Sequence, residues 1–179
     1  MTLGELPDYP WDNLAPYVER AKSHPDGAVD LSIGSPVDPT PEIVRTALRE
    51  HADAHSYPTT IGTPEARDAV VEWFARSRGV TGLGRANTML TVGSKEFVAT
   101  AAFFLRLGAG DTVVYPARAY PTYEIGAVFA GAAGFSGDDP ASWPASTKLI
   151  WLNSPGNPDG RVLGVDELRA AVERARELG

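Results

Sequence analysis

The stretch Lys148–Gly160, KLIWLNSPGNPDG, determines how the rest of the sequence is interpreted. Its first part, Lys148–Leu152, is a short apolar run that is typical of a buried strand. Its second part, Asn153–Gly160, holds two Asn, two Pro and two Gly within eight residues. This composition favours tight turns and permits a cis Asn157-Pro158 peptide bond. Because Val165–Leu178 then shows apolar residues at helical spacing, the stretch predicts a strand, an elaborate loop and a helix.

The same alternation of strand and helix extends upstream as far as residue 88. A helix is expected to begin at Ser94, which can act as its N-cap, and to end near Leu107. The remaining expected elements are strands at Thr88–Val92, Thr112–Tyr115 and Ala132–Phe135 and a helix at Pro121–Ala130. Repeated strand–helix units predict an α/β fold with a mostly parallel sheet that is covered by helices on both faces.

Two further helices are expected between an N-terminal arm and this sheet, and both begin with Thr-Pro. Thr40 and Thr63 are the expected N-caps, since a Thr hydroxyl can accept a hydrogen bond from the first helical turn. Pro41 and Pro64 suit the first helical position, where no backbone N–H is needed. Within the preceding arm, only Asn13–Ser23 has a helical pattern.

Composition and charge exclude several classes of function. The chain of 179 residues has a formal net charge of -7 and no cluster of Lys and Arg, which argues against nucleic-acid binding. It has no cysteine, and its three histidines lack the spacing of a metal site. No run of about 18 apolar residues occurs, and Met1–Tyr9 lacks the basic start and apolar run of a secretory leader, so neither a membrane span nor a leader is expected. These features predict a cytoplasmic protein without a metal or a membrane span.

Three loops at the carboxyl ends of expected strands are the candidate sites, because ligands of parallel sheets bind there. The loop Gly93–Glu96 opens a helix and offers N–H groups, a hydroxyl and an amine to a phosphate, although an ordinary capped turn has the same sequence. Tyr120 can stack on a planar ligand or pack at a helix start. Asn157 adds an amide donor, with a rigid surface loop as the alternative. Together the three loops suit pyridoxal phosphate (PLP).

On these motifs the sequence resembles the class I/II aminotransferases of PLP fold type I. The matching motifs lie at Gly93–Glu96, Ala119–Tyr123 and Asn153–Gly160, and the resemblance extends over residues 29–179. Within the family, Leu31–Pro41, Tyr57–Pro64 and Gly93–Glu96 are most similar to succinyldiaminopimelate transaminases of actinobacterial type. The resemblance implies a truncated three-layer fold: an arm and substrate loop at 1–40, linking helices and the start of the large domain at 41–87, and an incomplete PLP-binding large domain at 88–179.

The resemblance also implies roles for individual residues. Ser94 and Lys95 match the phosphate-binding pair, Tyr120 matches the residue stacked on the pyridine ring, and Asn157 matches the amide that hydrogen-bonds the phenolic oxygen. Tyr57 matches a residue that reaches the cofactor of the neighbouring subunit, which implies a homodimer. The implied cofactor-binding residues are therefore Gly93, Ser94, Lys95, Tyr120, Asn157 and Tyr57. The implied substrate-binding residues are Gly34 and Asn157.

The family's catalytic lysine, which forms a Schiff base with the cofactor, has no counterpart among Lys22, Lys95 and Lys148. In the family that lysine lies beyond the Asn-Pro-x-Gly loop and its helix. The sequence is therefore expected to be an inactive N-terminal portion of an aminotransferase. The implied reaction transfers an amino group between N-succinyl-LL-diaminopimelate and 2-oxoglutarate in lysine and diaminopimelate biosynthesis. The alternatives are another fold type I PLP enzyme, such as an amino-acid lyase, and a non-catalytic PLP-binding module.

Overall fold

The computed structural model describes residues 11–179, which divide into two compact units. Of the described residues, the larger unit contains 11–13 and Thr91–Gly179, and the smaller unit contains Leu14–Leu90. Pro7 and Pro10, which belong to the expected arm, lie outside the described residues. The two units are considered one at a time.

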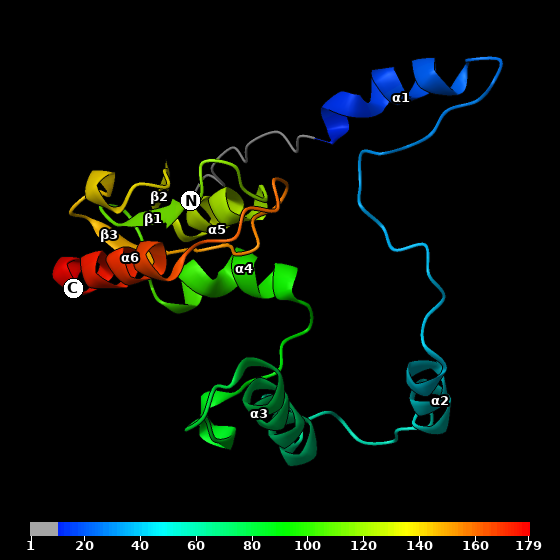
Figure 1. Ribbon diagram of the computed structural model, residues 1–179, viewed down its shortest axis with the longest axis horizontal. Coiled ribbons are helices and arrows are strands. Elements are labelled where there is room, and N and C mark those ends of the chain that lie inside the picture. Colours follow the sequence, from blue (N-terminus) through cyan, green and yellow to red (C-terminus); the bar gives the residue numbers. More distant parts are fainter. Residues whose placement is uncertain (1–10) are drawn as a thin grey trace. The chain divides into compact units, whose positions relative to one another are not determined.

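The larger unit is built on a three-stranded parallel sheet (Figure 1). Its strands are β1 (Thr112–Tyr115), β2 (Ala133–Ser136) and β3 (Thr147–Ile150), in the order β2-β1-β3. The central strand β1 is buried along most of its length, with Val113 and Val114 at 0% and 1% exposure. The structure therefore confirms the expected parallel sheet and the strands that follow residue 111.

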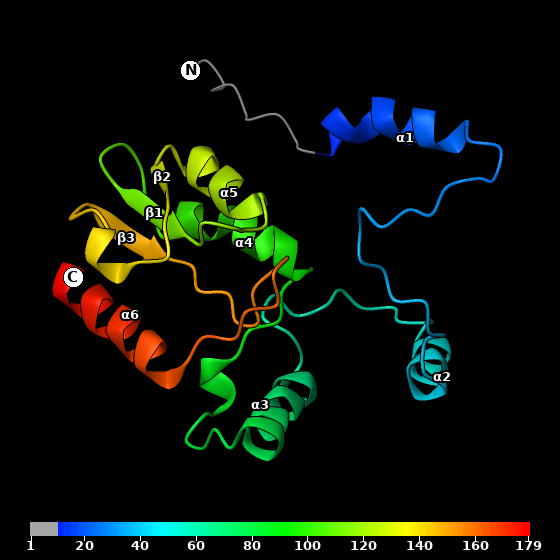
Figure 2. The same ribbon diagram turned by 45° about the horizontal axis from the view of Figure 1, so that its top comes forward.

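Helices cover both faces of this sheet (Figure 2). On one face, α4 (Ser94–Phe104) and α5 (Thr122–Ala130) pack on the Val113 side of β1, where Ala102, Val113 and Ala127 form a core. On the other face, α6 (Val165–Leu178) packs on the Val114 side, where Val114, Trp143 and Ala171 form a second core. Because neighbouring strand residues point to opposite faces, two consecutive valines serve the two cores. This arrangement confirms the three-layer architecture.

Gly126 allows α4 and α5 to pack with their backbones in contact. A Cβ atom built on Gly126 would lie 2.8 Å from the carbonyl oxygen of Val98 and 3.2 Å from that of Ala99. Both neighbours are helix backbone atoms, which cannot turn aside as the end of a flexible side chain can. This close packing fixes α5 against α4, and each of the two helices begins at a candidate loop.

Two expectations for the larger unit and its border are wrong. Thr88–Val92 forms no strand, because no strand among the described residues pairs with it. Its Leu90 N–H donates a single hydrogen bond to the carbonyl of Ile61, which lies in a loop. Ser94 is the first residue of α4 and not its cap. The N-cap is Gly93, whose φ of +87° lies in the region that favours glycine.

The smaller unit contains α1 (Ala15–Lys22), α2 (Glu42–Glu50), α3 (Pro64–Arg78) and a short 3-10 turn at Arg85–Asn87. Another 3-10 turn, Asp12–Leu14, precedes α1, and the division of the chain falls between Asn13 and Leu14. Helix α1 confirms the helical pattern expected in the arm. The Arg85 guanidinium pairs with Asp68 and lowers the pKa of that carboxyl group, mainly through their hydrogen bond. Arg67 Nε donates to the carbonyl of Thr88 at 2.9 Å, so a side chain of α3 fixes the segment that follows this helix.

The two Thr-Pro helix starts differ in the structure. The Thr63 hydroxyl accepts a hydrogen bond from Ala66 N–H at 3.2 Å and caps α3, as expected. Helix α2 begins one residue later than expected: Pro41 takes the N-cap position and Thr40 makes no capping bond. The reason is geometric, since the extended Pro41 backbone (ψ 139°) places Thr40 outside the first turn.

Candidate cofactor site

The three candidate loops of the larger unit meet around one aromatic side chain, Trp151. The Phe97 ring, one turn into α4, lies edge-on to Trp151 with ring centroids 6.2 Å apart. The Tyr123 ring, in the first turn of α5, lies 5.3 Å from Trp151 at a tilt of 39°. Trp151 itself directly follows β3 and precedes the Asn-rich loop. Figures 1 and 2 show this loop beside the first turns of α4 and α5.

The first loop has the geometry of an anion site. Gly93 has a φ of +87°, a backbone conformation that side chains other than glycine rarely adopt, so the position favours glycine. Ser94 and Lys95 follow as the exposed first residues of α4. The first N–H groups of a helix lack intrahelical partners and form the positive end of the helix dipole. The Glu96 carboxylate folds back towards Gly93, so it lies beside this end of the helix.

The second loop places Tyr120 immediately before α5, and its side chain is half-buried. Its carbonyl accepts the Tyr123 N–H at 3.1 Å, so the backbone of Tyr120 is tied to the first turn of the helix. Burial raises the pKa of the Tyr123 phenol. Burial, reinforced by Glu124, also raises the pKa of Tyr115 at the end of β1. Both phenols therefore stay neutral at physiological pH and act as packing and hydrogen-bonding groups.

The third loop presents Asn157 on a rigid backbone. Asn157 N–H donates to Asn153 Oδ1 at 3.0 Å, and the Asn157-Pro158 peptide bond is cis, as expected. The Ser154-Pro155 bond is also cis, and the sequence did not predict it. The Ser154 hydroxyl accepts Leu163 N–H at 3.0 Å and closes the loop. The exposed carboxamide of Asn157 has no hydrogen-bond partner among residues 11–179, so it is available to a ligand.

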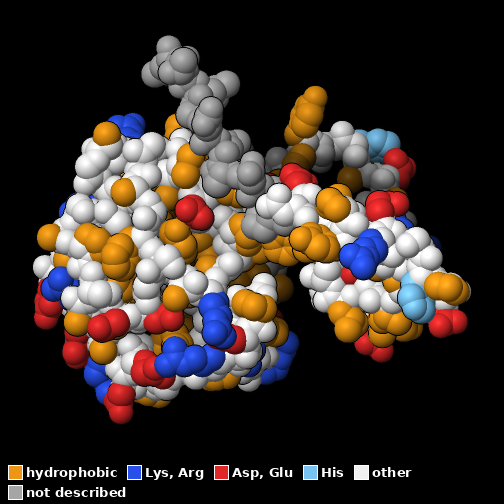
Figure 3. Space-filling model, turned by 90° about the horizontal axis from the view of Figure 1, so that it is seen from above, with side chains coloured by type: hydrophobic (Ala, Val, Ile, Leu, Met, Phe, Trp, Pro, Cys, Tyr) orange, Lys and Arg blue, Asp and Glu red, His pale blue; other side chains and the backbone are white. Residues whose placement is uncertain are grey.

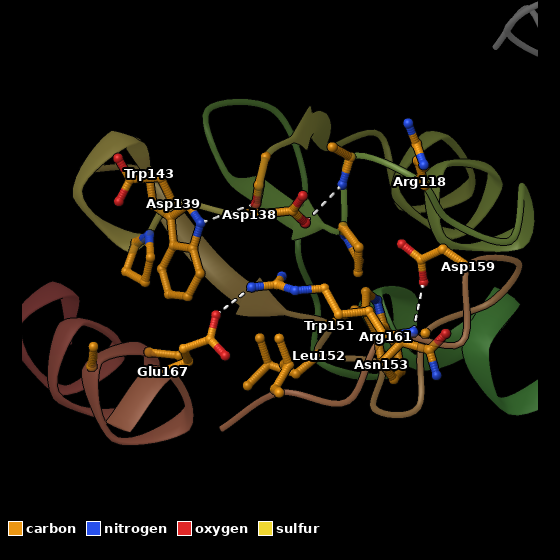
Figure 4. Close-up of a pocket in the computed structure, with 18 residues that line it drawn as sticks. Arg118, Asp138, Asp139, Trp143, Trp151, Leu152, Asn153, Asp159, Arg161 and Glu167 are labelled. Carbon is orange, nitrogen blue, oxygen red and sulfur yellow. Dashed lines mark hydrogen bonds and ion pairs between the residues drawn. The ribbon is translucent and has the colours of Figure 1, made fainter. Parts of the chain in front are cut away.

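A cavity of about 600 Å³ adjoins the third loop on the α6 side of the sheet (Figure 4). Trp143, Trp151 and Leu152 form much of its apolar wall, and an ion pair between Arg161 and Glu167 crosses it. Gly93, Ser94, Lys95, Tyr120 and Asn157 do not line this cavity. The residues of the larger unit that are predicted to bind the cofactor therefore lie outside this cavity.

Gly34 and Tyr57 belong to the smaller unit. Tyr57 is fully exposed in the chain between α2 and α3. A Cβ atom on Gly34 would meet no heavy atom within 4 Å. Both residues are thus accessible within their own unit, and the roles that the resemblance implies for them stay predictions.

The aromatic cluster Phe97–Tyr123–Trp151 is the part of the site that the sequence analysis missed. Its signal is present in the spacing: Phe97 lies three residues after Ser94, and Tyr123 lies three residues after Tyr120. In a helix this spacing places the two aromatic rings one turn behind the proposed ligand contacts. Their meeting at Trp151 depends on the sheet and could not be derived from local periodicity.

Lys22 pairs with Glu19 at 3.2 Å on the surface, and Lys148 is exposed on β3. No group of His, Asp and Glu among residues 11–179 could hold a metal ion. No helix within the described part of the chain is long and apolar enough to cross a membrane. On the face shown in Figure 3, basic side chains lie beside acidic ones and form no separate patch.

An α/β sheet with a helix-opening glycine turn, a half-buried tyrosine and an exposed carboxamide in the loops after its strands is the arrangement expected of a PLP-binding class of protein. The chain belongs to the family "Aminotransferase class I and II", whose sequence model matches residues 26–179. The members of this family are PLP-dependent enzymes.

Comparison with individual proteins agrees with the family. The chain is 47% identical over 176 residues to 4-dedimethylamino-4-oxo-anhydrotetracycline transaminase OxyQ of Streptomyces rimosus. The aligned region covers 98% of this chain and 49% of OxyQ. It is 30% identical to LL-diaminopimelate aminotransferase of Dehalococcoides mccartyi, over 95% of this chain and 48% of that enzyme. The crystal structure of aminotransferase AspB from Helicobacter pylori superimposes with a TM-score of 0.86 at 27% identity, over 97% of this chain and 49% of that one. The chain thus spans about half the length of these relatives.

Proposed function

We propose that this chain carries the phosphate-binding and ring-binding part of the cofactor site of a PLP-dependent aminotransferase. The observation that carries the proposal is the meeting of three family motifs around Trp151 at the carboxyl edge of the sheet. The donor set fits the cofactor, since it combines helix N–H groups, a hydroxyl, an amine, an aromatic ring and a carboxamide. When bound, PLP supplies the electron sink for amino-group transfer.

Each residue then has a defined task. Gly93 lets the backbone approach the phosphate, and Ser94 and Lys95 donate hydrogen bonds to its oxygens from the start of α4. Tyr120 stacks on the pyridine ring and excludes water from one of its faces. Asn157 donates a hydrogen bond to the phenolic oxygen through its unpartnered carboxamide. The chain alone is proposed to bind the cofactor without catalysing transfer, since neither Lys22 nor Lys148 lies in these loops and Lys95 faces the phosphate.

For the complete enzyme we propose amino transfer between N-succinyl-LL-diaminopimelate and 2-oxoglutarate in lysine and diaminopimelate biosynthesis. Gly34 and Asn157 would contact the substrate, and Tyr57 would contribute to the neighbouring site of a cytoplasmic homodimer. Support comes from the likeness of Leu31–Pro41 and Tyr57–Pro64 to succinyldiaminopimelate transaminases, and from the relatives named LL-diaminopimelate aminotransferase. A second candidate substrate is a 4-oxo-anhydrotetracycline, which the 47% identical relative OxyQ is named for.

A chimeric enzyme separates these candidates. The half of OxyQ that this chain matches is replaced by the chain, and OxyQ itself serves as the matched control with the same second half. We expect the chimera to convert N-succinyl-LL-diaminopimelate and 2-oxoglutarate to glutamate with a kcat/KM about tenfold above that of OxyQ, which corresponds to about 1.4 kcal/mol of transition-state binding. Glutamate formation, measured by mass spectrometry, is the readout.

Other results of this experiment would contradict the proposed substrate. Turnover of the tetracycline ketone alone supports the second candidate. Release of ammonia or cleavage of the amino acid without glutamate formation supports a lyase. A chimera that binds PLP but turns over none of these compounds, beside an active OxyQ control, supports a non-catalytic binding module.

A further inference from the structure

We infer that Trp151 is a positioning residue that holds the phosphate-binding turn of α4 and the ring-stacking Tyr120 in a fixed relation to each other. This inference rests on the proposed function, because it assigns the geometry of the same site. Trp151 touches no proposed cofactor atom. Its effect is transmitted through Phe97 and Tyr123, which lie one turn behind the ligand contacts.

The backbone of Trp151 is anchored by the sheet. Its N–H donates to the carbonyl of Val114 at 2.8 Å, so it extends the pairing of β3 with the buried central strand. Its indole packs against the core formed by Ala102, Val113 and Ala127. Strand pairing fixes the Trp151 backbone and core packing fixes its indole, so the loops that contact Trp151 pack against a rigid side chain.

Two aromatic contacts link Trp151 to the loops that precede α4 and α5. Phe97 meets the indole edge-on at 88° and lies on the same face of α4 as Ser94, three residues earlier. Tyr123 meets the indole at 5.3 Å, and its N–H binds the carbonyl of Tyr120. A displacement of either ring therefore displaces a ligand-binding residue directly.

Trp151 also borders the cavity on the α6 side (Figure 4), although its indole packs with the core on the α4 and α5 side. A smaller residue at position 151 would leave Phe97 and Tyr123 beside empty space and not beside new packing partners. We therefore expect both loops to loosen together when the indole is removed. Phenylalanine keeps an aromatic face for both rings, whereas leucine does not, so the pair Trp151→Phe and Trp151→Leu separates aromatic positioning from simple apolar burial.

The inference is tested first without ligand, by hydrogen exchange of the 179-residue chain. Trp151→Leu is expected to raise the exchange rates of the hydrogen-bonded amides at 97–99 and 123–125 together by about tenfold, as the loss of two aromatic contacts predicts. Trp151→Phe is expected to stay close to the original rates. The matched control is Trp143→Leu, which removes a 3% exposed indole from the opposite core and touches neither loop.

The second readout is the affinity for pyridoxamine 5′-phosphate, the amine form of the cofactor. Trp151→Leu is expected to raise the dissociation constant about tenfold, with rescue by Trp151→Phe and a smaller effect of Trp143→Leu. Equal loosening of both loops by Trp143→Leu and Trp151→Leu, or unchanged exchange in Trp151→Leu, would overturn the inference. If the original chain binds no pyridoxamine 5′-phosphate, the proposed function fails, whereas the exchange rates still decide whether Trp151 positions the loops.

Discussion

Replacing Gly126 by alanine is expected to destabilise the larger unit by about 2 kcal/mol, in the range of overpacked core substitutions. The new Cβ atom would lie 2.8 Å from the Val98 oxygen and 3.2 Å from the Ala99 oxygen, so α4 and α5 would have to separate. A loss of unfolding free energy in Gly126→Ala distinguishes close helix packing from an exposed helix position. At an exposed helix position the same substitution stabilises a protein by roughly 0.5–1 kcal/mol, because alanine restricts the unfolded chain.

Urea unfolding followed by circular dichroism measures this effect. Gly108→Ala is the matched control, because the nearest atom to its new Cβ, the carbonyl oxygen of Ala130, lies 3.9 Å away in ordinary contact. We expect the midpoint of Gly108→Ala to stay near that of the original chain. A Gly126→Ala chain as stable as the original would show that the two helix backbones are not in contact. The close packing that orients the site would then be absent.

Replacing Ser94 by aspartate is expected to weaken binding of pyridoxamine 5′-phosphate about a hundredfold, or by about 2.7 kcal/mol. The substitution removes a hydroxyl donor and sets a carboxylate against the phosphate. It should not harm the fold, because an acidic residue in the first turn of α4 is favoured by the helix dipole. Lost affinity with unchanged unfolding would therefore place the phosphate at this turn.

Isothermal titration calorimetry provides the affinity in this comparison. Ser142→Asp, in the exposed 3-10 turn at Pro140–Ser142, makes the same change of charge away from the site and should bind normally. Ser94→Ala loses only the hydroxyl, so its affinity should lie between those of Ser94→Asp and Ser142→Asp. If Ser94→Asp binds as well as Ser142→Asp does, the phosphate lies elsewhere.

Local patterns predicted the parts of the fold that local forces decide. Apolar runs located β1, β2 and β3 within one residue at their starts, and the turn residues of the third loop predicted the cis bond before Pro158. Thr63 was recognised as a cap from its place before proline. Gly131 ends α5 in the left-handed conformation, where the sequence also predicted the end of the helix.

The errors arose where structure depends on partners. Thr88–Val92 has the composition of a strand, but composition cannot provide the neighbouring strand that a ladder requires. Gly93 displaced Ser94 as the cap because its positive φ already turns the chain into α4. The cluster around Trp151 joins residues more than fifty positions apart in sequence, and such a contact follows from sheet order and helix packing.

The most direct test of the central claim compares two ligands on the unmodified chain. Pyridoxamine 5′-phosphate and pyridoxamine share the ring, the phenolic oxygen and the amine, and differ in the phosphate. Calorimetry is expected to show binding of the phosphorylated compound and at least about tenfold weaker binding of the other, because the start of α4 contributes through the phosphate. Equal affinities for the two compounds, or no binding of either, would contradict the assignment of this edge of the sheet as a PLP site.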